Sequence, residues 1–180
     1  MTPELNLLTR SDEEVLRARA ASLAQETLEE HAGDCVATLL FRLGEEWYAF
    51  RLADVREIHR EYRLTPLPCA PEFVLGVVSV RGEILSVSDL ARMMHLGTVS
   101  AKGQQPPAIV LANDVSEAAI VVDEIGDIAD IPIGSIEPPL SVVDRLQAPF
   151  VNGTVELNGR LVGLVDAERV LEPVGGPART

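Results

Sequence analysis

The feature that most constrains this fold is a repeat within the chain. When the sequence is displaced by 77 residues, the segment GVVSVRGEILSVSDLARMM, beginning at Gly76, lies on GTVELNGRLVGLVDAERVL, beginning at Gly153. The apolar positions match in phase, and the residues of the first copy with identical counterparts are Gly76, Val78, Gly82, Asp89 and Arg92. Agreement in a fixed order over this length favours an internal duplication over chance similarity between β segments.

The upstream parts of the two copies match more loosely. ATLLFRLGEEWYAFRL is similar to AIVLANDVSEAAIVVD, and ADVREI is similar to DEIGDI. Each copy is predicted to form about five strands, and it has too few residues to bury a strong core separately. Two small barrels that share an interface would solve this problem, and they would leave a cleft between them. The sequence therefore predicts a mainly β protein.

Short runs rich in β-branched, aromatic and leucine residues are separated by Gly, Pro and Asn turn signals. Asp89 and Asp166 each stand where a strand gives way to a short helix, expected at 89–96 and 166–171, so both are interpreted as N-caps rather than catalytic acids. The expected strands cover residues 36–43, 47–52, 77–80, 84–87, 108–112, 118–122, 154–157 and 161–165.

The first 34 residues have a different character. Ser11 followed by Glu14 forms a possible capping box, and a stripe composed mostly of alanine follows, so a helix ending near Gly33 is predicted. Such a helix buries little area and should dock weakly on the body of the protein or on a partner. These residues are too charged for a signal peptide, and no apolar run is long enough to span a membrane. We expect a cytoplasmic protein without membrane insertion.

Charge and cysteine usage exclude further classes of function. The net charge of −13 repels phosphate backbones and anionic lipid heads, so a nucleic acid partner is not expected. Cys35 and Cys69 lack any metal-ligand spacing, and we expect two buried or half-buried thiols in a reducing compartment.

No nucleotide-binding, metalloprotease or hydrolase motif occurs, and the three histidines share no ligand spacing, so neither catalysis nor a cofactor is expected. The best metal candidate is an acidic series interleaved with isoleucines. Because it lacks the alternation of an EF-hand loop, a strand with polar residues facing water and a kink near Gly126 explains it more simply. A small-molecule or metal-binding β-barrel protein that uses the cleft and this series remains the alternative. The series is Asp123, Glu124, Asp127 and Asp130.

Arg81 stands directly before Gly82 at the end of an apolar run. The matching position of the second copy is Asn158, an ordinary turn residue, so the turn itself does not require an arginine. The five fixed donors of arginine suit a carboxylate. We therefore expect Arg81 to contact Glu57 or an acid on another molecule, with a solvated arginine on a turn as the alternative.

Four stretches, taken together in order, resemble the bacterial CheW family of chemotaxis coupling proteins over about residues 36–173. The combination of V-x-E-I, a proline-rich link, F-V-x-G-V and a strand ending in R-G is specific as an ordered set. Ser79 and Val80 depart from the asparagine and leucine usual there, and the N-terminal helix lies outside the core family pattern. The stretches are LLFRLGEEWYAFRLADVREI, LTPLPCAPEFVLGVVSVRGEILSVSDL, AIVVDEIGDIADIP and FVNGTVELNGRLVGLVD.

The resemblance implies two tandem five-stranded SH3-like β-barrels and no enzymatic activity. The expected organisation is an N-terminal helical extension over 1–34, a CheW-like domain over 35–173 and a flexible tail over 174–180. Within the domain, a first barrel is expected over about 45–105, with a strand exchange with the second, expected over about 106–165.

The resemblance also implies partners. One face is expected to bind the regulatory domain of a CheA-type histidine kinase. The groove near the barrel junction is expected to bind the cytoplasmic tip of methyl-accepting chemoreceptors. The chain is thus expected to be a non-catalytic signalling adaptor in chemotaxis or a related chemosensory pathway, recruited to receptor arrays at the inner face of the membrane. Carried over by motif, the expected partner-binding residues are Val55, Glu57, Gly76, Arg81 and Gly82.

Overall fold

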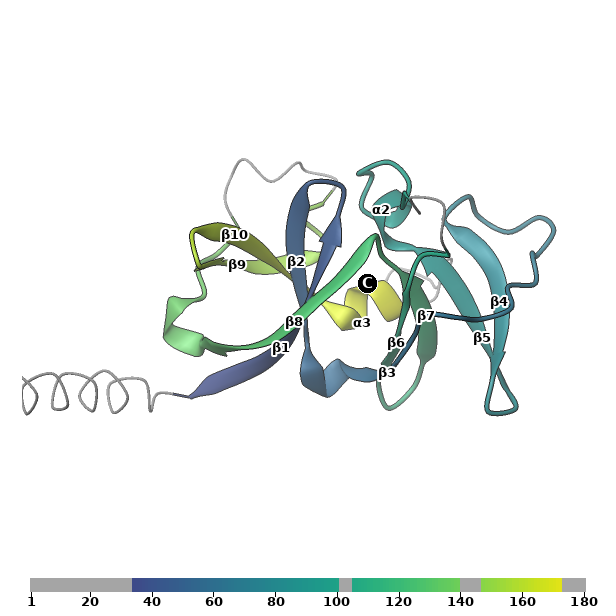
Figure 1. The fold of residues 1–180 in the computed structure, drawn as a ribbon, viewed down its shortest axis with the longest axis horizontal. Helices are drawn as coiled ribbons and strands as arrows, with labels where there is room; N and C mark the ends of the chain where they lie inside the picture. The colour runs from purple at the N-terminus through teal and green to yellow at the C-terminus, as the bar shows by residue number, and fades with distance from the viewer. Residues whose placement is uncertain (1–33, 101–104, 140–146, 173–180) are drawn as a thin grey trace, which may run out of the picture.

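The described residues form ten strands, two short α-helices and two 3-10 helices, η1 (Leu52–Asp54) and η2 (Ile133–Ser135) (Figure 1). The computed structural model describes residues 34–100, 105–139 and 147–172. The elements of the first copy are β1 (Cys35–Leu43), β2 (Glu46–Arg51), β3 (Val55–His59), β4 (Val74–Val80), β5 (Glu83–Asp89) and α2 (Leu90–Met93). Those of the second copy are β6 (Ala108–Ala112), β7 (Glu117–Val121), β8 (Glu124–Pro132), β9 (Val151–Leu157), β10 (Arg160–Val165) and α3 (Ala167–Leu171).

The strands form two five-stranded sheets with the same connectivity. One sheet has the order β8-β1-β2-β10-β9, and the other has the order β3-β6-β7-β5-β4. Each sheet therefore takes the first two strands of one copy and the last three strands of the other copy. The parallel pairs β2–β10 and β5–β7 join the two contributions. A cut of the chain near residue 105 would divide both sheets.

The exchanged strands β1, β2, β6 and β7 carry side chains that meet between the two sheets, and this explains their composition. The largest hydrophobic cluster contains Phe41 and Phe50 of β1 and β2 together with Ile109 and Ile120 of β6 and β7. Both helices contribute to it, and Figure 1 shows α3 between the sheets. Each of the two smaller hydrophobic clusters consists of residues from one sheet. Four of the five residues of β6 are buried because both faces of this strand are covered, and its sequence AIVLA is accordingly apolar throughout.

The duplication is visible in details as well as in topology. A β-bulge interrupts β4 between Val74 and Gly76, and a matching bulge interrupts β9 before Gly153. The carboxylate of Asp89 accepts a hydrogen bond from the backbone N–H of Arg92, and that of Asp166 caps α3 in the same way. The interpretation of both aspartates as N-caps is confirmed, as is the mainly β fold of two five-stranded units.

The structure corrects several details of the sequence prediction. The charged strand β3 was not among the expected strands, because its sequence VREIH lacks a continuous apolar run. The helix expected over 89–96 ends at Met93, because His95 and Gly97 adopt φ angles of 59° and 107°. Cys35 and Cys69 are exposed rather than buried, because one opens β1 and the other lies in the loop before β4.

Two expectations concern the ends of the chain. The N-terminal helix and the tail over 174–180 lie outside the described residues. Within the described part of the chain, no helix is long and apolar enough to cross a membrane.

Candidate functional site

The hairpin between β4 and β5 positions Arg81. Val80 pairs with Glu83 across a two-residue turn, in which Arg81 and Gly82 adopt φ angles of 50° and 89°. This geometry is the type I′ turn that matches the twist of a tight β-hairpin. A left-handed conformation is uncommon for arginine and common for asparagine, which stands at the equivalent Asn158 with a φ of 52°. The first copy therefore has an arginine where the local backbone favours another residue.

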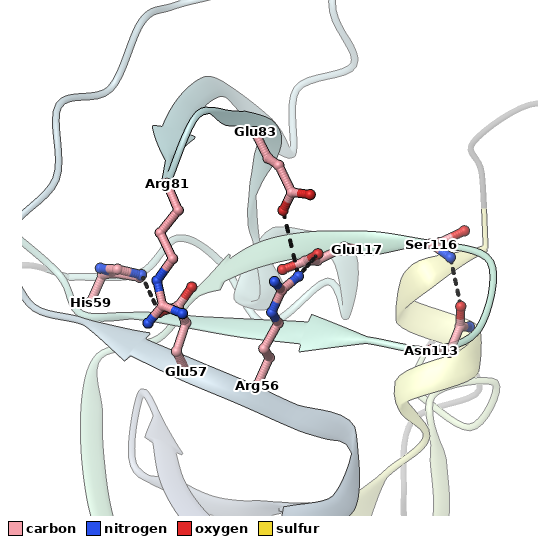
Figure 2. A network of polar contacts seen from close by, with 8 residues as sticks. All are labelled: Arg56, Glu57, His59, Arg81, Glu83, Asn113, Ser116 and Glu117. Carbon is pink, nitrogen blue, oxygen red and sulfur yellow. Dashed lines mark hydrogen bonds and ion pairs between the residues drawn. The ribbon is translucent and has the colours of Figure 1, made fainter.

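The guanidinium of Arg81 donates to the carboxylate of Glu57 on β3 at 2.9 Å (Figure 2). The Arg81 side chain is 73% exposed, whereas that of Glu57 is only 15% exposed. The intramolecular partner considered from the sequence is thus the one observed. An ion pair with one exposed member contributes little to stability, so the two side chains are free to exchange their contact for one with another molecule.

A second ion-pair group lies beside the first and originates in a β-bulge. The register of β3 against β6 shifts between Val55 and Glu57, which leaves Arg56 as the extra residue. Bulges redirect side chains, and Arg56 hydrogen-bonds to Glu117 of β7 and lies 3.5 Å from the carboxylate of Glu83 on β5. Figure 2 shows this group next to the Arg81–Glu57 pair.

His59 completes the same face. Its Nε2 atom lies 3.5 Å from the Oε2 atom of Glu57. This nitrogen is buried and has no hydrogen-bond partner. We regard the contact as a near approach rather than a hydrogen bond, because 3.5 Å is too long for a normal N–H···O bond. Sequence reasoning did not single out His59, because the three histidines share no ligand spacing.

The corresponding face of the second copy carries none of these cations. Alignment of ADVREI with DEIGDI places Gly126 at the position of Arg56 and Ala129 at that of His59. Gly126 is required by packing, because a Cβ there would lie 2.7 Å from the ring of Trp47. The bulge in the pairing of β8 with β1 falls at this point, which confirms the expected kink.

Gly76 and Val55, the remaining candidates from the sequence, have no exposed functional group. Gly76 is buried, and a Cβ there would lie 2.2 Å from the backbone oxygen of Thr65. The backbones of Thr65 and Val77 form two hydrogen bonds of 2.8 Å, which hold this loop against β4. Val55 packs against the central core. Either residue would therefore act on a partner by shaping the surface.

Two members of the acidic series, Asp123 and Glu124, are used in structural contacts. The carboxylate of Asp123 accepts hydrogen bonds from the backbone N–H groups of Gly44 and Ser100, which ties the β1–β2 turn to the loop after α2. Glu124 forms an ion pair with Arg42 at 2.9 Å. Among the residues that the structure describes, no three His, Cys, Asp or Glu side chains are grouped closely enough to hold a metal ion. The alternative of a metal-binding protein thus has no support.

A cleft lies beside the contacts of Asp123 and Glu124, as expected for two units that share an interface. Its walls come from both copies, and the Arg42–Glu124 ion pair lies in its lining. The lining residues are Arg42, Arg60, Glu61, Ser100, Gln105, Pro106, Pro107, Asp123, Glu124 and Ile125.

Comparison with known proteins gives a consistent result. The family model described as CheW-like domain matches residues 37–174. The chain is 29% identical over 133 residues to the chemotaxis protein CheW of Rhizobium meliloti, covering 73% of this chain and 84% of that protein. It is 30% identical over 139 residues to the protein FrzA of Myxococcus xanthus, covering 71% and 86%.

The solved structures include a similar fold. The crystal structure of the scaffolding protein TtCheW from Thermoanaerobacter tengcongensis matches with a TM-score of 0.71 and 26% sequence identity. The match covers 81% of this chain and 98% of that one.

Proposed function

The chain belongs to the CheW-like domain family, and on this premise we propose that it joins chemoreceptors and a CheA-type histidine kinase in one assembly. A chemotaxis adaptor or scaffold acts through stoichiometric contacts rather than through catalysis. In this assembly the chain would bind the regulatory domain of the kinase. It would also bind the cytoplasmic tip of the receptors' helical hairpin. The complex would form in the cytoplasm, at receptor arrays on the inner face of the membrane.

The partner-binding surface that we propose is the face formed by β3 and the β4–β5 turn. Arg81 and Glu57 would supply the polar contacts, and Gly82 would set the turn that presents the arginine. Gly76 and Val55 would shape the same surface from beneath, through the loop at Thr65 and the core.

The observation that supports this choice is the difference between the two copies. Their strands, bulges and N-caps match, yet the cations Arg56 and Arg81 have no basic counterpart in the second copy. The turn does not need Arg81, since Asn158 forms it equally well. Residues that the fold does not need, gathered on one exposed face, indicate selection for binding.

The pathway is a separate question, because similar proteins carry different names. CheW of Rhizobium meliloti is named for chemotaxis, whereas the matches also include FrzA of Myxococcus xanthus and PilI of Pseudomonas aeruginosa. The same coupling mechanism would serve any chemosensory pathway that uses a receptor and a CheA-type kinase.

The substitution Arg81→Asn tests the proposed surface. Asparagine keeps the type I′ turn, as Asn158 does, while it removes the guanidinium and its contact with Glu57. We expect the melting temperature to stay within a few degrees, and the affinity for the cognate kinase regulatory domain or receptor tip to fall at least about tenfold, as is common for a central arginine of an interface. Isothermal titration calorimetry with each partner gives the dissociation constant.

The matched control is Arg169→Ala. Arg169 is also exposed and also pairs with a carboxylate, that of Glu172 at 3.1 Å, but it lies on α3. Wild-type affinity for both partners in the Arg81→Asn protein would refute the proposed surface. Folded wild-type protein that binds neither partner would refute the proposed function.

A further inference from the structure

Glu57 is flanked by two basic side chains, of which only one is bonded to it. Arg81 donates to Oε2 of Glu57 at 2.9 Å. The Nε2 atom of His59 lies 3.5 Å from the same oxygen, without a hydrogen-bond partner although it is buried. A buried nitrogen without a partner costs free energy. A shift of a few tenths of an ångström would convert this approach into a hydrogen bond.

Protonation of the imidazole changes the balance between the two contacts. When Nε2 of His59 carries no proton it cannot donate to the carboxylate, which is left to the guanidinium, whereas an imidazolium donates a charge-assisted hydrogen bond from Nε2 and neutralises the carboxylate. The attraction between Glu57 and Arg81 then weakens, and the two cations repel each other. Because Arg81 is the exposed member of the group, it is the one that moves into solvent.

Among the described residues, the neighbouring Arg56 is already paired with Glu117 of β7 and Glu83 of β5, so it does not compete for Glu57. On its own strand the facing group is Glu57, and the β4–β5 turn contributes Arg81. The residue paired with His59 on β6 is Ala108, which has no charge. The next residue of the chain, Arg60, is exposed and lines the cleft rather than the pair.

We propose that His59 is a proton-responsive competitor for Glu57, and that its protonation releases Arg81 for an acidic group of the binding partner. The link to a partner rests on the function proposed above. Imidazole is the side-chain group that most readily gains or loses a proton near neutral pH, which suits a histidine to such a role. Ala129 at the equivalent position gives the second copy no such group.

The first test needs no partner. The full-length chain is titrated between pH 5 and 8 while NMR follows the His59 ring and the Arg81 Nε–H, with the His59→Ala protein to assign the ring. We expect both resonances to move with one midpoint. Glu57→Gln should abolish the response of Arg81, because it removes the carboxylate for which the two side chains compete. A response of Arg81 that persists in the Glu57→Gln protein, or an Arg81 resonance that does not respond in the wild type, would overturn the proposal.

The second test measures the affinity for the receptor tip or kinase regulatory domain at pH 6.0 and 7.5. We expect the wild type to bind more tightly at pH 6.0 than at pH 7.5, because protonation of His59 makes Arg81 available to the partner. His59→Ala should bind at both values of pH with equal affinity. His95→Asn, which replaces a histidine outside the site and keeps its positive φ, is the control and should behave as the wild type does.

The outcomes separate the two proposals. Binding that is equally strong at both values of pH, or a dependence on pH that persists in the His59→Ala protein, would refute the proton-responsive role while the adaptor function stands. Absence of binding at either pH, with the expected NMR titration, would refute the coupling to a partner and leave the exchange within the free chain.

Discussion

Gly76→Ala is predicted to be among the most destabilising single-methyl additions to this fold. The residue has a φ of 152°, where an L side chain is strained at a cost of about 1–3 kcal/mol. The added Cβ would also lie 2.2 Å from the backbone oxygen of Thr65. Because that atom belongs to the backbone, the clash is relieved only if the loop moves away from β4.

Movement of the loop would break the two 2.8 Å hydrogen bonds between Thr65 and Val77, each contributing about 0.5–1.5 kcal/mol. The sum with the strain is about 2–6 kcal/mol. For a domain of this size 1 kcal/mol corresponds to about 2–4 °C, so we expect the melting temperature to fall by about 5–20 °C.

Gly82→Ala is the matched control, since Gly82 also has a positive φ, of 89°, but no atom within 4 Å of the added methyl group. Its cost is the backbone strain alone, about 1–2 kcal/mol. Differential scanning calorimetry of the three proteins measures the difference. The Gly76→Ala protein should melt about 3–10 °C below the Gly82→Ala protein. Equal melting temperatures would show that the contact at Thr65 does not constrain the fold.

Three further predictions concern the caps, the bulge and a buried phenol. In urea titrations, Asp89→Ala should lower the free energy of unfolding by more than the ~1 kcal/mol expected for Asp166→Ala. The reason is that Asp89 is 1% exposed and also accepts a hydrogen bond from the backbone of the loop after α2. Equal losses in the two proteins would contradict this. Gly126→Ala should shift the fluorescence of Trp47, the single tryptophan, because its ring lies 2.7 Å from the added methyl group; an unchanged spectrum would refute that packing. Burial raises the pKa of Tyr48 above its usual 10, and its hydrogen bond to Glu46 acts in the same direction. The unfolded chain therefore loses this proton first, and stability should fall above about pH 10. Tyr48→Phe should reduce the alkaline loss, and an identical pH profile would contradict the assignment.

Much of the architecture could be predicted from the repeat. The copies agree at glycines, aspartates and apolar positions because the same bulge, N-cap and strand occur in each. These features depend on residues close together in sequence, and local patterns carry that information. The turn at Arg81 could also be interpreted, since Asn158 in the other copy serves as an internal control.

The exchange of strands is harder to predict from local patterns. The parallel pairing of β2 with β10 joins Tyr48 to Gly163, and nothing in either segment specifies the other. Resemblance to a known family suggested an exchange, but only the structure shows which strands take part. Local patterns also missed β3, because its outward side chains are charged and its register is set by pairing with β6.

The candidate site was likewise predictable only where sequence motifs mark its residues. Arg81 and Glu57 were paired by charge complementarity between two conspicuous motifs, whereas His59 has no motif and is identified only by an unpartnered buried nitrogen. The acidic series suggested a metal because side-chain identity alone does not reveal hydrogen bonding. In the structure, Asp123 and Glu124 are already used by backbone N–H groups and by Arg42.

The most direct test of the adaptor function is a sedimentation assay with three components. Receptor tips displayed on vesicles are mixed with the CheA-type kinase, with and without this chain, and the kinase in the pellet is measured. We predict that the kinase sediments with the receptors only when the wild-type chain is present, and less with the Arg81→Asn protein. An amount of kinase in the pellet that does not depend on the chain would contradict its role as the coupling component.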